Sequence, residues 1–265
     1  EDTMAQIKQS EEWMSAIDYS IHNQQFIPES AIMSISNVPK ADKPANIIVS
    51  RLRSFEAAAQ YIGKRTAVLN FASATNPGGG VEKGASAQEE CLCRVSTLYP
   101  CLADQKMRAS FYTPHRKNGN TLHNDDIIYT PKVLIIKDDD HNMLATPFLV
   151  DVISCAAPNL REKSNNAYNS GDGNKVQISD NELLALHEKR ARKIFASAIA
   201  NGVEVLILGA FGCGAFQNDP HIVAQAYKNV LPDFAHYFHT IEFAIYCRPA
   251  DSINYDAFKS TILNS

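Results

Sequence analysis

The sequence has no long apolar run and no concentration of positive charge. No segment reaches the roughly 18 apolar residues that a membrane-spanning helix needs, so we expect no membrane partner. The polar, acidic stretch at residues 1–13 is not typical of a signal peptide. The formal net charge is -4, which argues against a broad basic surface for nucleic acid. A polyanionic ligand would therefore be held by local features such as backbone N–H groups, helix N-termini and single cations.

Paired metal-binding or disulfide motifs are also missing. The six cysteines form no C-x-x-C pair, so we expect small buried apolar side chains in a reducing, cytoplasmic setting. His236 and His239 resemble a pair on one helix, but no carboxylate stands at a matching spacing. We therefore expect no metal and no other cofactor.

Two common nucleotide-binding motifs are absent. No G-x-x-x-x-G-K-[ST] occurs, which excludes a P-loop. The glycine-rich stretch that begins at Gly212 breaks the G-x-G-x-x-G pattern at its last position, Gln217. A dinucleotide-binding oxidoreductase is therefore disfavoured.

What the sequence does contain is an alternation of apolar, β-rich runs with helical patterns. Several runs are nearly continuous, which is typical of strands covered on both faces. The alternation predicts an α/β protein, a three-layer α/β/α domain with a mixed, mostly parallel sheet. The expected strands cover residues 46–50, 65–73, 125–130, 133–138, 148–157, 203–211 and 241–247, and the expected helices cover 3–21, 54–62, 179–201 and a segment from Asp219.

The 265 residues suit one large domain with a small accessory segment, and without a heptad pattern we expect a monomer. One polar stretch, residues 158–179, interrupts the alternation. Loops of this length are typical of lids or of disordered segments, and both interpretations stay open.

Two glycine-rich loops follow predicted strands and precede helix starts. One contains Gly78, Gly79 and Gly80, and the other spans residues 209–220. Open α/β sheets bind ligands at such strand ends. Glycine lets the backbone N–H groups approach a ligand closely, and the helix N-terminus adds positive potential. Each loop alone could be a tight turn, but two together favour a phosphate-bearing ligand.

Two adjacent glutamates follow the first glycine loop. Ser86-Ala87-Gln88-Glu89 matches a capping box, so Glu89 has a possible structural role at the start of a helix that should end before Pro100. Glu90 lies about 100° further around that helix, so the two carboxylates should not flank one bond as in an ordinary glycosidase. Without further information Glu90 is also compatible with a solvated first-turn glutamate.

Together these residues resemble a known family. Gly78-Gly79-Gly80, seven further residues and Gln88-Glu89-Glu90 resemble the GGG-x(6–8)-QEE signature of poly(ADP-ribose) glycohydrolases. The stretch from residue 208 to 220 is similar to the diphosphate-binding loop of macrodomains. The resemblance covers about Ala45 to Cys247 and implies a macrodomain-like catalytic domain over 45–265, preceded by an N-terminal accessory helical segment over 1–44.

The resemblance implies hydrolysis of ribose–ribose O-glycosidic bonds in poly(ADP-ribose), with ADP-ribose as product. Glu90 would be the general acid and base, Glu89 would hydrogen-bond a ribose hydroxyl, and Phe216 would pack against the distal ribose. Cys213 would be a small loop residue rather than a nucleophile. A mono(ADP-ribosyl) hydrolase and a non-catalytic ADP-ribose-binding macrodomain are the alternatives. The implied substrate-binding residues are Asn76, Gly78, Gly79, Gly80, Gln88, Gly212, Cys213, Gly214, Ala215 and Phe216.

Overall fold

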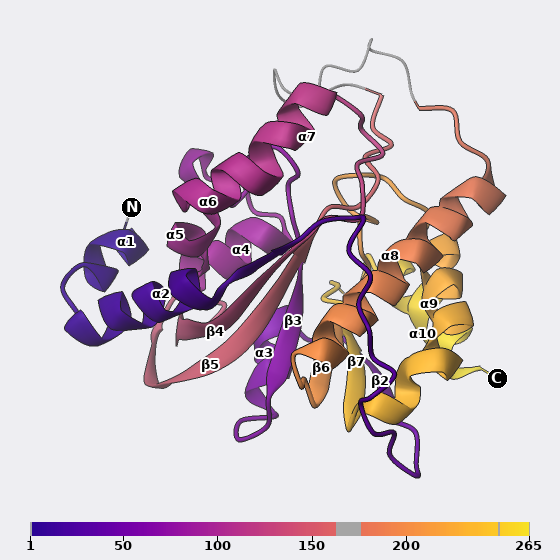
Figure 1. The fold of residues 1–265 in the computed structure, drawn as a ribbon, viewed down its shortest axis with the longest axis horizontal. Coiled ribbons are helices and arrows are strands. Elements are labelled where there is room, and N and C mark those ends of the chain that lie inside the picture. Colours follow the sequence, from indigo (N-terminus) through magenta and orange to yellow (C-terminus); the bar gives the residue numbers. More distant parts are fainter. Residues whose placement is uncertain (1, 163–175, 249, 265) are drawn as a thin grey trace.

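A central sheet organises the chain. The computed structural model describes residues 2–162, 176–248 and 250–264. Over these residues the sheet has seven strands in the order β1-β4-β5-β3-β6-β7-β2 (Figure 1). The run β5-β3-β6-β7-β2 is parallel and β1-β4-β5 is antiparallel, which confirms the mixed, mostly parallel sheet. The strands are β1 (Gln25–Ile27), β2 (Asn46–Ser50), β3 (Thr66–Phe71), β4 (Ile127–Lys137), β5 (Met143–Cys155), β6 (Val205–Leu208) and β7 (Thr240–Ala244).

Helices cover both faces of this sheet, as Figure 1 shows. Consecutive residues of β3 divide between two cores: Leu69 packs with the α8–α9 side, and Val68 packs with the α3–α4 side. That division follows from the two-residue period of a strand and confirms the three-layer prediction. The covering helices are α3 (Ser54–Ala59), α4 (Gln88–Val95) and α5 (Leu98–Leu102) on one side, and α8 (Asp180–Ala200), α9 (Pro220–Phe234) and α10 (Ile253–Leu263) on the other.

The long helices begin where the sequence signals are strongest. Ser179 caps α8 and forms a capping box with Glu182, and Asp219 caps α9 with Pro220 in its first turn. Gly202 has a φ of +70°, a left-handed conformation that glycine adopts without strain just past a helix end. The predicted helices at these positions are confirmed.

The N-terminal helix is broken where one continuous helix was expected. α1 (Asp2–Ile7) and α2 (Glu11–Asn23) are separate because Ser10 caps α2 by accepting a hydrogen bond from the Trp13 N–H at 3.3 Å. Ile7 and Ile17 are buried against α5 and β4, whereas Met14 is 40% exposed. The same segment continues into β1, which pairs with β4 at the edge of the sheet.

Two expected strands are one. β4 (Ile127–Lys137) joins most of the two expected strands, 125–130 and 133–138, with a register shift between Thr130 and Val133. Pro131 has no N–H to give to the ladder, and Lys132 has a φ of +54°. The Lys132 N–H instead donates to Asp151 Oδ1 at 2.9 Å. A bulge therefore carries the strand past the proline.

The helix that carries the glutamates ends at Val95, before Pro100 as predicted, and a new helix, α5, holds Pro100 in its first turn, where proline is tolerated. The expectation that His236 and His239 share one helix is wrong. His236 lies in the short helix η3 (Ala235–Tyr237), whereas His239 lies beyond it, just before β7. In the described part of the chain, no helix is long and apolar enough to span a bilayer, and no group of three or more His, Cys, Asp or Glu side chains has a metal-binding arrangement.

Candidate active site

The two glycine-rich loops lie at the same edge of the sheet. β3 and β6 are parallel neighbours, with Thr66 opposite Val205, so their carboxyl ends point the same way. The first loop leads from β3 through η1 (Val81–Lys83) to α4, and the second leads from β6 to α9. Both predicted loops therefore meet at one site, beside the N-terminal ends of two helices.

Glu89 is buried and held by the end of β3. It is 3% exposed. Its Oε2 accepts a hydrogen bond from the Ser73 N–H at 2.8 Å, and its Oε1 accepts one from Asn70 Nδ2 at 3.3 Å. The N-cap of α4 is Ala87, with no side-chain cap hydrogen bond. The capping-box alternative with Ser86 is therefore wrong, because the Glu89 carboxylate is directed to the strand instead.

Burial also changes the acidity of Glu89. Desolvation raises the pKa of the Glu89 carboxyl from 4.5 to about 8, and the hydrogen bonds from Ser73 and Asn70 oppose that rise. The charge of Glu90 adds a smaller upward effect. A carboxyl in this environment keeps its proton near neutral pH, as acid catalysts in apolar surroundings do.

Glu90 is arranged differently. It is 7% exposed, which excludes a solvated first-turn glutamate. Its Oε1 accepts a hydrogen bond from the Gly80 N–H at 2.8 Å. Its Oε2 is buried and has no partner among the described residues. A buried polar atom without a protein partner is costly in a native protein, and a catalytic role is one explanation for it.

The glycine loop approaches both carboxylates closely. A Cβ on Gly79 would lie 2.4 Å from Glu90 Oε1 and 3.1 Å from Glu89 Oε2. Gly79 also has a φ of +59°. A side chain at this position would thus displace the glutamates. Residue 79 is a glycine because the two carboxylates leave no room for a Cβ. On Gly78 and Gly80, a Cβ would meet Tyr99 at 2.8 Å and Ala85 at 2.9 Å.

Gln88 connects α4 to the sheet. Its Oε1 accepts from the Phe71 N–H at 2.9 Å, and its Nε2 donates to the Leu69 carbonyl at 2.8 Å and to Ser54 Oγ at 3.0 Å. The amide is thus occupied by protein partners. We therefore interpret Gln88 as a residue that positions Glu89 and Glu90, and the expected substrate contact stays a prediction.

Asn76 lies on the same loop and is linked to a basic side chain that sequence reasoning missed. Arg116, on α7 (Thr113–Asn118), donates from Nε to the Thr75 carbonyl at 2.5 Å and from Nη2 to Asn76 Oδ1 at 3.2 Å. The Asn76 carbonyl in turn accepts from the Gly79 N–H at 2.9 Å. Arg116 thereby holds the segment that leads into the three glycines.

The second loop offers unused N–H donors. No described residue accepts from the backbone N–H of Gly212, Gly214, Ala215 or Phe216. The Cys213 N–H differs, because it donates to the Ala210 carbonyl at 3.1 Å. A Cβ on Gly214 would meet nothing within 4 Å. Unpaired N–H groups beside an open space before a helix suit an anion.

The second glycine-rich loop is held in place by residues that belong to no motif found in the sequence. A Cβ on Gly212 would lie 2.6 Å from Ala157 Cβ. Asn218 Nδ2 donates to the Gly212 carbonyl at 3.0 Å and the Pro158 carbonyl at 2.7 Å, and Asn218 Oδ1 meets His187 Nε2 at 2.9 Å. Burial lowers the pKa of His187 to about 4, so the imidazole is neutral and donates its Nε2 proton to Asn218.

Cys213 and Phe216 complete the loop. Burial raises the pKa of the Cys213 thiol, so it is a thiol rather than a nucleophilic thiolate. The Phe216 ring lies 6.2 Å from the His123 ring, centroid to centroid, and the Phe216 carbonyl accepts from the Leu160 N–H at 3.0 Å. Most of the polar stretch 158–179, namely residues 163–175, lies outside the described residues. The lid and disorder interpretations of this stretch both stay predictions.

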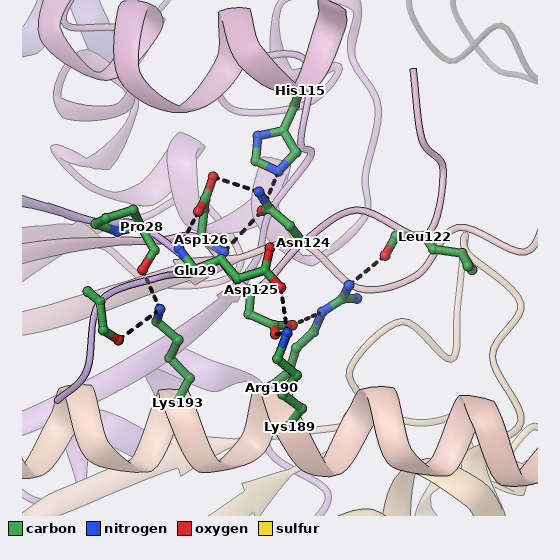
Figure 2. A network of polar contacts seen from close by, with 11 residues as sticks. Pro28, Glu29, His115, Leu122, Asn124, Asp125, Asp126, Lys189, Arg190 and Lys193 are labelled. Carbon is green, nitrogen blue, oxygen red and sulfur yellow. Dashed lines mark hydrogen bonds and ion pairs between the residues drawn. The ribbon is translucent and has the colours of Figure 1, made fainter. Parts of the chain in front are cut away.

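A buried ion pair holds the loop that carries His123. Arg190 of α8 contacts Asp125 through Nε at 2.9 Å and donates to the Leu122 carbonyl at 2.5 Å (Figure 2). Asp125 is 2% exposed and Arg190 1% exposed. Lys189 adds a second contact to Asp125 at 2.7 Å. The pair links α8, in one of the outer helical layers, to the loop at the rim of the site.

The same network reaches the N-terminal segment. Asp126 Oδ1 accepts from the Glu29 N–H at 2.6 Å, and Lys193 donates to the Pro28 carbonyl (Figure 2). Asn124 joins this side to His115, whose Nε2 lies 2.8 Å from Asn124 Oδ1. The segment after β1 is thus bound to α8 and to the loop beside Phe216. The boundary predicted at residue 44 stays a prediction.

Fold and site together define a macrodomain-like α/β protein with a buried pair of carboxylates. Comparison with known proteins gives the family: the model described as "Microbial-type PARG, catalytic domain" matches residues 3–138, where PARG denotes poly(ADP-ribose) glycohydrolase. The chain belongs to this family of glycosidases. A search of curated proteins found no match.

Solved structures agree with this family. The poly(ADP-ribose) glycohydrolase from Thermomonospora curvata is 31% identical, with a TM-score of 0.81 over 93% of this chain and 88% of that one. The enzyme from Deinococcus radiodurans, in complex with ADP-ribose, is 29% identical, with a TM-score of 0.80 over 93% of this chain and 96% of that one. The Thermomonospora enzyme is also similar in its complex with the inhibitor ADP-HPD, at 30% identity and a TM-score of 0.78 over 92% of this chain and 87% of that one.

Proposed function

We propose that this protein hydrolyses the ribose–ribose bonds of poly(ADP-ribose), with Glu90 as the general acid and base and with release of ADP-ribose. One observation carries the assignment of Glu90. Its Oε1 is held by the Gly80 N–H, whereas its buried Oε2 has no protein partner. A carboxyl that is oriented through one oxygen and free at the other can transfer a proton to the leaving oxygen.

The reaction uses this carboxyl twice. Glu90 gives its proton to the leaving ribose oxygen as the glycosidic C–O bond breaks, and the positive charge develops on the anomeric carbon of the other ribose. Water then attacks that carbon and returns a proton to the Glu90 carboxylate. The Gly79–Gly80 backbone lies against Glu90, so we expect the loop to shift as the substrate enters.

Glu89 has the supporting role in this proposal. Its two oxygens already accept from Ser73 and Asn70, so it is held more rigidly than Glu90. We propose that it contacts a ribose hydroxyl beside the scissile bond. The pKa of about 8 for Glu89 favours a second assignment, in which Glu89 is the proton donor. The two assignments differ in which glutamine variant abolishes the chemistry.

The second loop is proposed to bind the diphosphate. The N–H groups of Gly212, Gly214 and Ala215 have no acceptor among the described residues, and α9 begins just beyond them. Oxygens of a diphosphate accept hydrogen bonds from such donors. Because the net charge of the chain is -4, the attraction for the anion comes from these N–H groups and the helix dipole. Phe216 would then lie next to the distal ribose.

The test compares glutamine variants on polymer and on ADP-ribose. Glu90→Gln should retain ADP-ribose affinity, measured by calorimetry, and lose polymer hydrolysis by about 10³-fold or more, because the proton donor is gone. Glu89→Gln should keep more activity than Glu90→Gln. The reverse order would transfer the acid role to Glu89, and full activity in both variants would contradict the proposed mechanism.

A parallel assay on mono-ADP-ribosylated protein addresses the alternative substrate. Release of ADP-ribose from that protein at a rate equal to release from the polymer would favour the mono(ADP-ribosyl) hydrolase. The non-catalytic alternative requires wild-type protein to bind ADP-ribose without cleaving polymer. The paired buried glutamates support the enzyme, because a binding module gains nothing from a buried carboxylate without a partner.

A further inference from the structure

One surface beside the site has a charge opposite to that of the whole chain. Residues 105–119 contain four basic side chains and no acidic one, in a chain with net charge -4. They form a continuous helical rod: α6 (Gln105–Met107), the π-helical turn η2 (Arg108–Tyr112) and α7. Figure 1 shows α6 and α7 of this rod beside α4. We call Lys106, Arg108, Arg116 and Lys117 the basic ridge.

Three of the four cations of the basic ridge face solvent. Lys106, Arg108 and Lys117 are exposed, and within the described ranges none of the three forms an ion pair. The nearest acid in the sequence, Asp104, caps α6 by accepting from the Lys106 N–H at 2.9 Å. Exposed cations gathered on one helical rod create a positive potential at short range, even in a chain whose net charge is negative.

The ridge is joined directly to the catalytic loop. Arg116 donates to the Thr75 carbonyl and to Asn76 Oδ1, and Asn76 leads within two residues to Gly78. Arg108 donates to the Ala103 carbonyl at 2.7 Å, at the end of α5. The ridge thus borders the glutamate side of the site, while the proposed diphosphate loop lies on the other side of β3, after β6.

The position matches the part of the substrate that leaves. The unit being cleaved places its diphosphate on the second loop and its distal ribose at the glutamates. The leaving ribose belongs to the next unit of the polymer, which carries a diphosphate of its own. We infer that the basic ridge binds the phosphates of the polymer beyond the scissile bond, an inference that rests on the proposed function.

The test neutralises the ridge without touching the glutamates or Asn76. The variant Lys106→Gln/Arg108→Gln/Lys117→Gln should lower kcat/KM on long polymer about fivefold or more at low salt, because three phosphate contacts are lost. The slope of log kcat/KM against log salt should become less negative by about 2, at about 0.7 per contact. Affinity for ADP-ribose should stay within about twofold, since none of the three substituted side chains belongs to the residues assigned to ADP-ribose.

Matched controls separate the ridge from net charge and from folding. Lys8→Gln/Lys43→Gln/Lys259→Gln removes the same charge from exposed positions on other parts of the fold. Lys106→Gln/Lys117→Gln leaves the Arg108 hydrogen bond intact and should show about two thirds of the change in salt slope.

Three outcomes would overturn the inference. The first is an equal loss of kcat/KM on polymer in the ridge and control triple variants, and the second is an ADP-ribose affinity that falls in parallel with polymer turnover. The third is that single-stranded RNA competes for the wild-type protein as strongly as unlabelled polymer does. Failure of the proposed function is distinct, because wild-type protein would then not cleave the polymer at any salt concentration, whether or not it binds ADP-ribose.

Discussion

The contact between Gly79 and Glu90 gives the most direct test of the site, through the change Gly79→Ala. The added Cβ would lie 2.4 Å from Glu90 Oε1, whereas ordinary contact begins at 3.4 Å, so the carboxylate must move by about 1 Å. A carboxylate at the end of a side chain moves easily, so the protein should fold. A misplacement of about 1 Å can reduce catalysis about 10²-fold, and we expect a loss of that size.

Gly84→Ala is the matched control. Gly84 has a φ of +78° and Gly79 a φ of +59°, so alanine at either position carries a similar backbone strain of about 1–2 kcal/mol. A Cβ on Gly84 meets nothing within 4 Å. Both variants should therefore lose comparable stability in urea unfolding, measured at the same temperature and salt concentration. Release of ADP-ribose from polymer should fall in Gly79→Ala alone.

The outcome that refutes this reasoning is specific. If Gly79→Ala and Gly84→Ala lose activity to the same extent, backbone strain accounts for the effect and the close contact with Glu90 is irrelevant to catalysis. If Gly79→Ala keeps full activity, the carboxylate tolerates the displacement and Glu90 is not the positioned acid.

Three further predictions test the fold and the site. Because the pKa of Glu89 in the folded protein is raised to about 8 from 4.5, its contribution to stability is complete below pH 4.5 and is lost as the pH rises to about 8. In urea unfolding between these pH values, the wild type should lose more stability than Glu89→Gln, and parallel curves of stability against pH would contradict the shift. Asp125→Ala should lower the free energy of unfolding by about 3–5 kcal/mol, because Arg190 would be left buried without its counter-charge. The change Asp233→Ala at an exposed ion pair should lower it by less than about 1 kcal/mol, and equal losses would refute a structural role for the buried pair. Gly214→Ala should leave the melting temperature unchanged, since its Cβ meets open space, but should weaken ADP-ribose binding in calorimetry, and unchanged affinity would remove the diphosphate from that loop.

Sequence periodicity predicted the core of the fold well. The apolar runs that became β3, β5, β6 and β7 are continuous because helices cover both faces of the sheet. Local capping signals gave the starts of α8 and α9. The errors arose where one local signal competed with another: Ser10 starts a second helix within an apolar period, and Pro131 interrupts a strand without ending it.

The glutamates show the limit of a local argument. Ser86 to Glu89 matches a capping box in every letter, yet the Glu89 carboxylate binds the Ser73 N–H and Asn70, which are distant in sequence. The strand end and the glycine loop supply better-placed donors than the helix start does. Gln88 was expected at the substrate, which stays a prediction, and the structure adds contacts of its amide with β3 and α3.

By itself, the sequence determined the layer architecture, the two glycine loops and the pair of adjacent glutamates, because periodicity, glycine content and residue spacing are local properties. Only the tertiary structure decided which oxygen of Glu90 lacks a partner, why Gly79 must be glycine and how Arg190 and Asp125 hold the rim of the site. Those features depend on contacts between residues far apart in the chain, such as Thr75 with Arg116. Burial and hydrogen-bond geometry arise only when the sheet brings such residues together.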